Sequence, residues 1–280
     1  MQDLAPVEVA FTAADGTHLV GRRMGRGKPV VLIHGSGGGL NSFDPVAPLL
    51  ADEFELWVYA RRGYAPSDGC SRAKTFHDDV ADLTSVLAAT GGRAHVVGVS
   101  YGATVALHAA QRDSAMIRSV ALFEPPLYSA GSALAPVLAR YRRLVAAGDL
   151  PAASRLFAEK VSHVPAVILD ALAQVPDARR NAEQEAAEAA EAVACLHDLE
   201  AMATDEPDVG RWVDVRLPVL LIQGADTWAP MPTTMDTLAE ALPQVTRRRL
   251  AGQMHFATHT APELFADTLS QFLRAALDQR

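Results

Sequence analysis

One serine stands in a setting that suits a nucleophile. Ser100 is the centre of Gly98-Val-Ser-Tyr-Gly102, which directly follows a strand pattern at His95–Val99 and precedes a helical pattern at Ala103–Gln111. Small residues at 98 and 102 allow a sharp turn that presents the hydroxyl at the tip of a sheet, where a helix N-terminus favours developing negative charge. The spacing predicts a nucleophile that attacks a carbonyl carbon; a purely structural turn is the alternative.

A serine needs a base before it can attack. His255 follows a predicted strand at Val245–Leu250 and precedes the last predicted helix, so we expect it in a loop at the same edge of the sheet. His259, in the same loop, is the alternative base, and otherwise a cap or hydrogen-bonding neighbour of that helix. The spacing of the two histidines is similar to that of a zinc helix, but the glutamate of such a site is missing, so no metal is expected.

The base in turn needs an acid to orient it. Asp226 follows a predicted strand at Val219–Ile222, and it gives the chain order Ser, Asp, His. Glu124, at the end of the predicted strand Val120–Phe123, is the alternative, because a carboxylate buried there needs a partner. We expect Asp226 to be the acid.

Two backbone donors should stabilise the oxyanion that forms on attack. The N–H of Tyr101, next to the nucleophile, is one, and we expect that of Ser36, in the glycine-rich loop His34–Gly39, to be the other. That loop has neither the GxGxxG nor the GK[ST] spacing, so it predicts no nucleotide cofactor. The rings of Trp228 and Phe256 flank the candidate acid and base, and they favour a small, apolar or aromatic acyl substrate, with simple loop packing as the alternative.

The elements that must position these residues form an alternating pattern. A hairpin at Val7–Phe11 and His18–Arg22 is followed by short apolar runs without polar alternation, which are typical of strands buried on both faces. Helical patterns separate these runs, which predicts an α/β fold with a mostly parallel sheet covered by helices on both sides. Leu127–Val213 is Ala-rich and shows no strand pattern. We therefore expect a core of residues 1–126 and 214–280 and a helical insertion at 127–213, whose charged run Arg179–Met202 we interpret as a solvated helix face.

Composition excludes several classes. The chain has 280 residues and a net charge of −8 from 25 basic and 33 acidic side chains, which disfavours a nucleic acid or an anionic membrane as partner. Cys70 and Cys195 are distant from one another and show no metal-ligand spacing, so we expect no disulfide framework and a reducing, cytoplasmic location. Neither a signal peptide nor a membrane span is predicted. The sequence leaves a homodimer as one possible assembly.

Together these motifs resemble the α/β-hydrolase superfamily. The matching segments are the loop His34–Gly39, the segment Arg61–Asp68 after the predicted strand Leu56–Tyr59, the turn Gly98–Gly102, the acid loop Gly224–Pro230 and the histidine loop Gly252–Phe256. The resemblance implies an eight-stranded sheet, a helical cap over the site and cofactor-free chemistry. Some members carry the acid after the sixth strand, which keeps Glu124 as the alternative.

The expected function is hydrolysis of a carboxylic ester or related acyl bond through an acyl-enzyme. The alternatives are a C–C bond hydrolase, a thioesterase and a lactonase that use the same residues. The hypothesis from a different class of function is a non-catalytic ligand-binding protein on the same fold.

Overall fold

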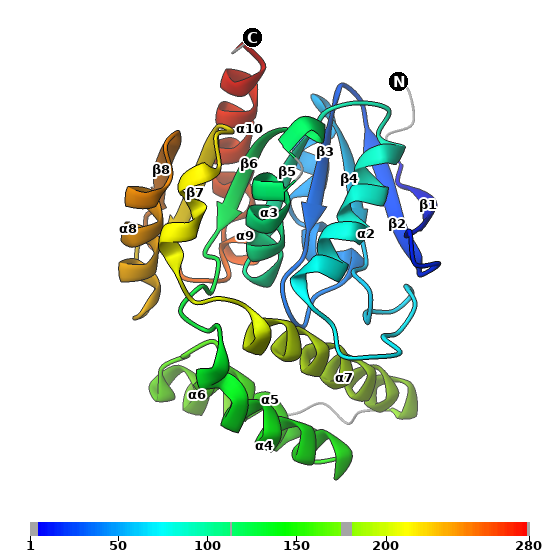
Figure 1. The fold of residues 1–280 in the computed structure, drawn as a ribbon, viewed down its shortest axis with the longest axis vertical. Coiled ribbons are helices and arrows are strands. Elements are labelled where there is room, and N and C mark those ends of the chain that lie inside the picture. The colour runs from blue at the N-terminus through cyan, green and yellow to red at the C-terminus, as the bar shows by residue number, and fades with distance from the viewer. Residues whose placement is uncertain (1–4, 113, 175–180, 279–280) are drawn as a thin grey trace.

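The computed structural model describes residues 5–112, 114–174 and 181–278. Its centre is one eight-stranded sheet with the order β1-β2-β4-β3-β5-β6-β7-β8 (Figure 1). The strands are β1 (Val7–Thr12), β2 (His18–Gly25), β3 (Lys28–Ile33), β4 (Phe54–Tyr59), β5 (Ala94–Val99), β6 (Ile117–Phe123), β7 (Val219–Gly224) and β8 (Val245–Leu250). The predicted α/β fold class is confirmed.

Strand direction follows the pattern of the sequence. β1 and β2 form the predicted antiparallel hairpin, and β2 also runs antiparallel to β4. All pairings from β4 to β8 are parallel. Parallel strands need long crossovers that cover both faces, which is why the central strands read as continuous apolar runs.

Helices cover the two faces of the sheet. The helices that flank the sheet are α1 (Ala47–Leu50), α2 (Phe76–Ala89), α3 (Tyr101–Arg112), α8 (Met231–Ala241), α9 (Ala257–Thr260) and α10 (Pro262–Asp278), with short 3₁₀ turns at η1 (Leu40–Phe43) and η2 (Ser114–Met116). Side chains of β3 alternate between two cores: Val31 and Ile33 join the core under α2, α3 and α8, whereas Val30 and Leu32 join the core under α1 and α10.

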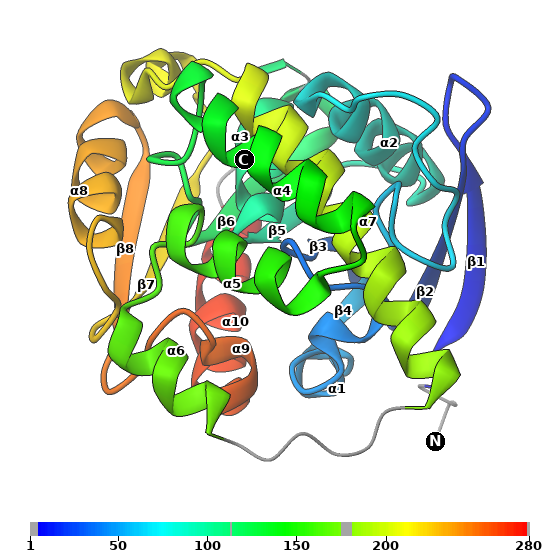
Figure 2. The ribbon, with the colours of Figure 1, turned by 90° about the horizontal axis from the view of Figure 1, so that it is seen from below.

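The segment between β6 and β7 is helical in its described part, as predicted. It contains η3 (Ser132–Leu134), α4 (Ala135–Ala146), α5 (Leu150–Lys160), α6 (Ala166–Ala173), α7 (Ala182–Thr204) and η4 (Val209–Asp214). Seen from below, α4, α5 and α7 lie across one edge of the sheet (Figure 2). Leu199 and Met202 of α7 belong to the same apolar core as α2 and α3, so the inserted helices are packed against the sheet layer. Arg179, the start of the predicted charged face, lies outside the described residues.

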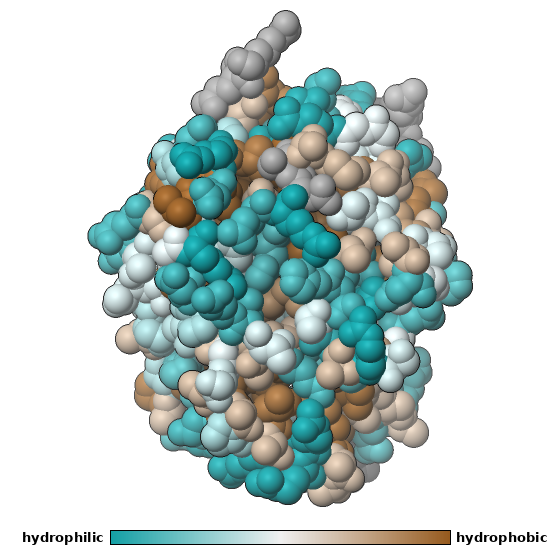
Figure 3. All heavy atoms as spheres, viewed as in Figure 1, coloured by the Kyte–Doolittle hydropathy of each residue, from teal (hydrophilic) through white to brown (hydrophobic). Residues whose placement is uncertain are grey.

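The surface is mixed in character. On the face shown in Figure 3, apolar side chains are scattered among hydrophilic ones. Among the helices that the structure describes, none combines the length and the apolar character needed to cross a bilayer.

Candidate active site

The turn around Ser100 has the sharp geometry that its spacing predicts. Ser100 joins β5 to α3 with φ 54°, a left-handed conformation that is uncommon for a residue with a side chain. A Cβ at Gly98 would lie 2.3 Å from the carbonyl oxygen of Gly102, and one at Gly102 would lie 2.3 Å from that of Ile33. Both positions therefore require glycine, and the hydroxyl-bearing residue is held at the end of the strand.

His255 lies in the loop between β8 and α9, with its ring stacked on Phe123 at a centroid distance of 5.8 Å and an interplanar angle of 19°. Its Nδ1 is 2.6 Å from Oε2 of Glu124. A carboxylate only accepts hydrogen bonds, so Nδ1–H donates to Glu124, and in the neutral imidazole Nε2 then carries no proton. That tautomer is the one a general base requires.

Glu124 is built into the site. Its side chain is fully buried, 0% exposed, directly after β6. Besides His255, its carboxylate accepts hydrogen bonds from the N–H of Gly224 at 2.8 Å and from the hydroxyl of Thr227 at 3.2 Å. Glu124 also has a left-handed backbone, with φ 47°, which turns the chain at the end of the strand. Three donors hold the carboxylate in one orientation against the imidazole.

The predicted contact between Asp226 and His255 is wrong. Asp226 is exposed, and the loop that carries it is fixed by backbone hydrogen bonds, including one from the Asp226 N–H to the carbonyl of Gln253 at 2.9 Å. It lies only two residues beyond Gly224, and this short turn leaves its carboxylate in solvent. The next side chain, Thr227, reaches Glu124 instead. Glu124, the alternative from the sequence, makes the contact with His255 that was expected of Asp226.

The alternative base is placed away from these groups. His259 is exposed on α9, and its Nδ1 lies 2.9 Å from the hydroxyl of Thr258. Within the described part of the chain, no cluster of three or more His, Cys, Asp or Glu side chains could hold a metal ion.

Two backbone N–H groups near Ser100 could receive an oxyanion. Among the described residues, neither the N–H of Ser36 nor that of Tyr101 donates a hydrogen bond. The phenol of Tyr101 is turned away into the core, where it donates to Asp79 at 2.7 Å and its ring stacks on Phe76. Tyr101 can therefore offer its backbone to a substrate, but its ring belongs to the core.

A pocket of about 360 Å³ joins these elements. Its lining residues are Ser36, Ser100, Pro126, Tyr128, Phe157, Val161, Ser162, Met202, Thr227, Trp228, Met231 and His255. Trp228 lines the pocket, and its indole N–H donates to the carbonyl of Ser162 in the inserted segment at 2.9 Å. Phe256 is not among the lining residues and is 47% exposed; its ring lies beside those of Trp228 and His255, so its place beside a substrate stays a prediction.

A buried charged residue of α7 escaped the sequence reasoning. Asp198 is 0% exposed and forms a two-pronged ion pair with Arg61, with oxygen–nitrogen distances of 2.8 and 2.7 Å. The charged run of this helix was interpreted as solvated, yet Asp198 lies three residues after Cys195 and four before Met202, both of them buried. That spacing places it on the apolar stripe of the helix, which was the available signal.

The comparison with known families agrees with this geometry. A family model described as alpha/beta hydrolase fold matches residues 28–262. The chain belongs to this family. The matched range contains Ser100, Glu124 and His255, together with the glycine-rich loop that carries Ser36.

Individual relatives cover nearly the whole chain. The 2-(acetamidomethylene)succinate hydrolase of Mesorhizobium japonicum is 26% identical over 267 residues, which cover 91% of each chain. The structure of an alpha/beta hydrolase from Sphaerobacter thermophilus matches with a TM-score of 0.79 and 28% identity, covering 95% of this chain and 100% of that one. The enol-lactonase from Burkholderia xenovorans matches with a TM-score of 0.71 and 21% identity, covering 94% and 99%.

Proposed function

We propose that the protein is a serine hydrolase that cleaves a carboxylic ester or a related acyl bond, with Ser100, His255 and Glu124 as its catalytic triad. The observation that carries the proposal is the 2.6 Å contact between His255 Nδ1 and a fully buried Glu124, beside a serine in a strained strand-to-helix turn. Strain and a buried carboxylate are both costly, and they recur where a reaction depends on them.

In this mechanism His255 takes the proton of the Ser100 hydroxyl on Nε2 while the serine oxygen attacks the carbonyl carbon. The N–H groups of Ser36 and Tyr101 receive the oxyanion. Glu124 stabilises the imidazolium that forms. His255 then protonates the leaving group, and water cleaves the acyl-enzyme in the reverse sequence of proton transfers.

The pocket favours an uncharged, apolar acyl group. Pro126, Phe157, Val161, Met202 and Met231 supply carbon surface, and the described lining residues include no lysine, arginine or carboxylate. A substrate carboxylate would thus meet no cationic side chain there. The Mesorhizobium relative is named for a succinate derivative, so we propose a different acyl preference for this chain. We also propose that the inserted segment caps the site, since Phe157, Val161 and Met202 come from it.

A lactone is the second candidate substrate, because a similar structure is named an enol-lactonase and the ring ester of a lactone would undergo the same attack. The test is a panel of acyl esters of different chain length, thioesters and lactones, offered to the wild type and to Ser100→Ala. The proposal expects turnover that is highest for an uncharged ester and lost in Ser100→Ala. Full turnover by Ser100→Ala would contradict covalent catalysis, and preference for a lactone would replace the substrate class.

A further inference from the structure

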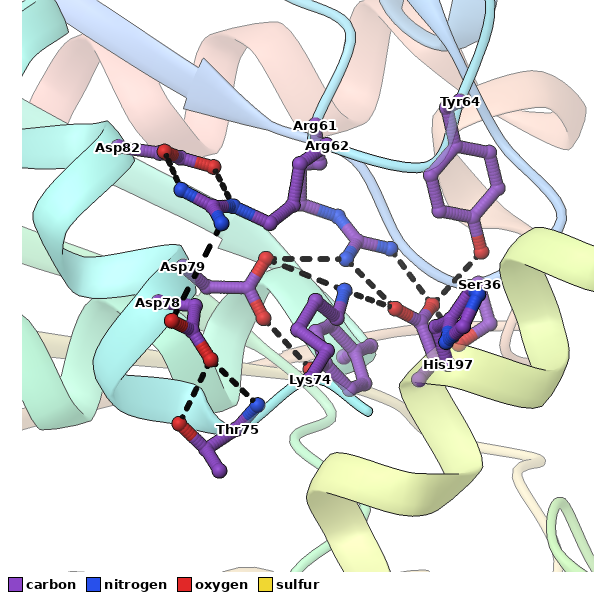
Figure 4. Close-up of polar contacts among 12 residues, drawn as sticks. Ser36, Arg61, Arg62, Tyr64, Lys74, Thr75, Asp78, Asp79, Asp82 and His197 are labelled. Carbon is purple, nitrogen blue, oxygen red and sulfur yellow. Dashed lines mark hydrogen bonds and ion pairs between the residues drawn. The ribbon is translucent and has the colours of Figure 1, made fainter. Parts of the chain in front are cut away.

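A buried charge cluster lies between the sheet, α2 and the inserted helix α7 (Figure 4). We define it as Arg61, Lys74, Asp79 and Asp198, all of them buried. Lys74 Nζ contacts Asp198 at 2.6 Å and Asp79 at 3.2 Å, while Arg61 contacts Asp79 at 3.5 Å in addition to its pair with Asp198. Two cations face two anions, so the cluster is balanced in charge without any ligand.

Asp198 is the acceptor on which this cluster converges. Burial by itself raises the pKa of its carboxyl, but the charges of Arg61 and Lys74, and their hydrogen bonds, outweigh burial and hold the pKa well below its usual range. The carboxylate is therefore charged at neutral pH. It also accepts hydrogen bonds from the hydroxyls of Tyr64 at 2.7 Å and Ser36 at 2.8 Å.

The loop of residues 34–37 is fastened by the same groups. Arg61 donates from Nε to the carbonyl of His34 at 3.0 Å and from Nη2 to the carbonyl of Gly35 at 3.2 Å. The N–H of Gly37 donates to the phenol oxygen of Tyr64 at 3.2 Å. Gly35 and Gly37, the residues on either side of Ser36, are thus linked to Asp198 through Arg61 and Tyr64. The N–H of Ser36 itself donates no hydrogen bond within the described chain.

A second ion pair in the same region provides a comparison. Arg62, the residue after Arg61, makes a two-pronged pair with Asp82 of α2 at 2.7 and 2.6 Å, and both side chains are buried. Within the part of the chain that the structure describes, this pair makes no hydrogen bond or ion pair to residues 34–37 or to α7. The two pairs are similar in construction and burial, but only that of Asp198 reaches a group of the active-site pocket.

We propose that Asp198 is a positioning residue for the oxyanion hole. Through the Ser36 hydroxyl and through Arg61, it holds the loop so that the Ser36 N–H is fixed toward the reacting carbonyl. The inserted helix α7 thereby takes part in transition-state stabilisation as well as in roofing the pocket. This inference rests on the proposed function, because an oxyanion hole has meaning only for attack by Ser100.

The main test removes the Ser36 hydroxyl but keeps its backbone N–H. Loss of a whole oxyanion donor costs about 10²–10³ in kcat. We expect Ser36→Ala to lower kcat about tenfold, because the backbone N–H of residue 36 is still present but is no longer held through the hydroxyl bond to Asp198. KM for the best ester should stay within about twofold, and affinity for a trifluoromethyl ketone, which forms an oxyanion on Ser100, should fall in parallel with kcat. Ser36→Thr, which restores a hydroxyl, should recover most of both.

Asp198→Asn and the double variant Ser36→Ala/Asp198→Asn complete the cycle. If the two residues act as one unit, Asp198→Asn lowers kcat at least as much as Ser36→Ala, and the double variant loses no more than Asp198→Asn alone. Asp82→Asn is the matched control: it should lower the melting temperature, with kcat of the folded enzyme within about twofold of wild type. If Asp198→Asn does not fold, the Ser36→Ala and Ser36→Thr pair decides alone.

The inference would be overturned if Ser36→Ala had the kcat and the ketone affinity of the wild type. It would also be overturned if Ser36→Thr lost as much of both as Ser36→Ala. Failure of the proposed function has a different signature, because Ser100→Ala would then retain turnover whatever residue stands at position 36. Loss of activity in Ser100→Ala together with full activity in Ser36→Ala refutes the positioning role alone.

Discussion

Replacing Glu124 with glutamine should inactivate the enzyme while leaving its fold intact. Glutamine has nearly the same shape, and its amide oxygen can still accept the N–H of Gly224. Its NH₂ group would then face His255 Nδ1 and could only donate. Nδ1 would have to lose its proton, so Nε2 would carry it and could no longer take the proton of Ser100.

The size of the effect follows from the charge that is removed. A carboxylate about 4 Å from the centre of an imidazolium contributes about 4 kcal/mol at an effective dielectric constant of about 20. Each 1.36 kcal/mol of barrier is about tenfold in rate, so loss of this term alone lowers kcat by about 10³. The wrong tautomer adds to this, and the equivalent amide substitution in a serine protease costs about 10⁴. We expect a loss of about 10³ to 10⁴ in kcat with KM little changed.

The assay is steady-state hydrolysis of the best ester by Glu124→Gln and by Asp226→Asn, with thermal unfolding of both. Asp226→Asn is the matched control, because Asp226 is exposed and belongs to the same group of loops; its kcat should stay within about twofold of wild type. A larger loss in Asp226→Asn than in Glu124→Gln would refute the assignment of the acid.

Three further outcomes follow from the structure. In an unfolding assay, Gly102→Ala should destabilise the protein by about 3 kcal/mol or prevent folding, because its Cβ would lie 2.3 Å from the carbonyl oxygen of Ile33. The control Gly92→Ala should be nearly neutral, because the space around Gly92 is open. Burial, and after it the nearby charge of Arg61, lowers the pKa of His34 from 6.5 to about 3. Between these two pH values the unfolded chain binds a proton at His34 and the folded chain does not. The wild type should therefore lose about 2–3 kcal/mol of stability at this residue between pH 7 and pH 4.5. Urea unfolding of His34→Gln should show a shallower acid loss, and identical slopes would count against this. Met202 lines both the active-site pocket and a second pocket of about 270 Å³. If shortening its side chain opens one to the other, Met202→Ala should raise the ratio of kcat/KM for long-chain esters to that for short-chain esters, and an unchanged ratio would refute this.

The parts of the fold that depend on local pattern could be predicted from the sequence. The buried runs that became β3 to β8 differ from the alternating hairpin of β1 and β2, because parallel strands are covered on both faces. The turn at Ser100 could also be predicted, because nearby backbone atoms leave no room for a side chain at its two glycines.

The acid could not be decided in this way. Asp226 and Glu124 both follow a strand that ends at the same edge of the sheet, and the choice depends on which side chain turns inward over a few residues of loop. Asp198 was missed for a related reason. Its partners Arg61 and Lys74 lie more than 120 residues earlier in the chain, and a charge pattern on one helix does not reveal cations that another segment brings to it.

Covalent labelling is the most direct test of whether Ser100 is an activated nucleophile. The wild-type protein is treated with a fluorophosphonate, and intact mass and peptide mapping locate the adduct. The expected result is a single phosphonyl group on Ser100, none on Ser100→Ala, and much slower labelling of Glu124→Gln. No adduct on the wild type, or an adduct that persists in Ser100→Ala, would contradict it.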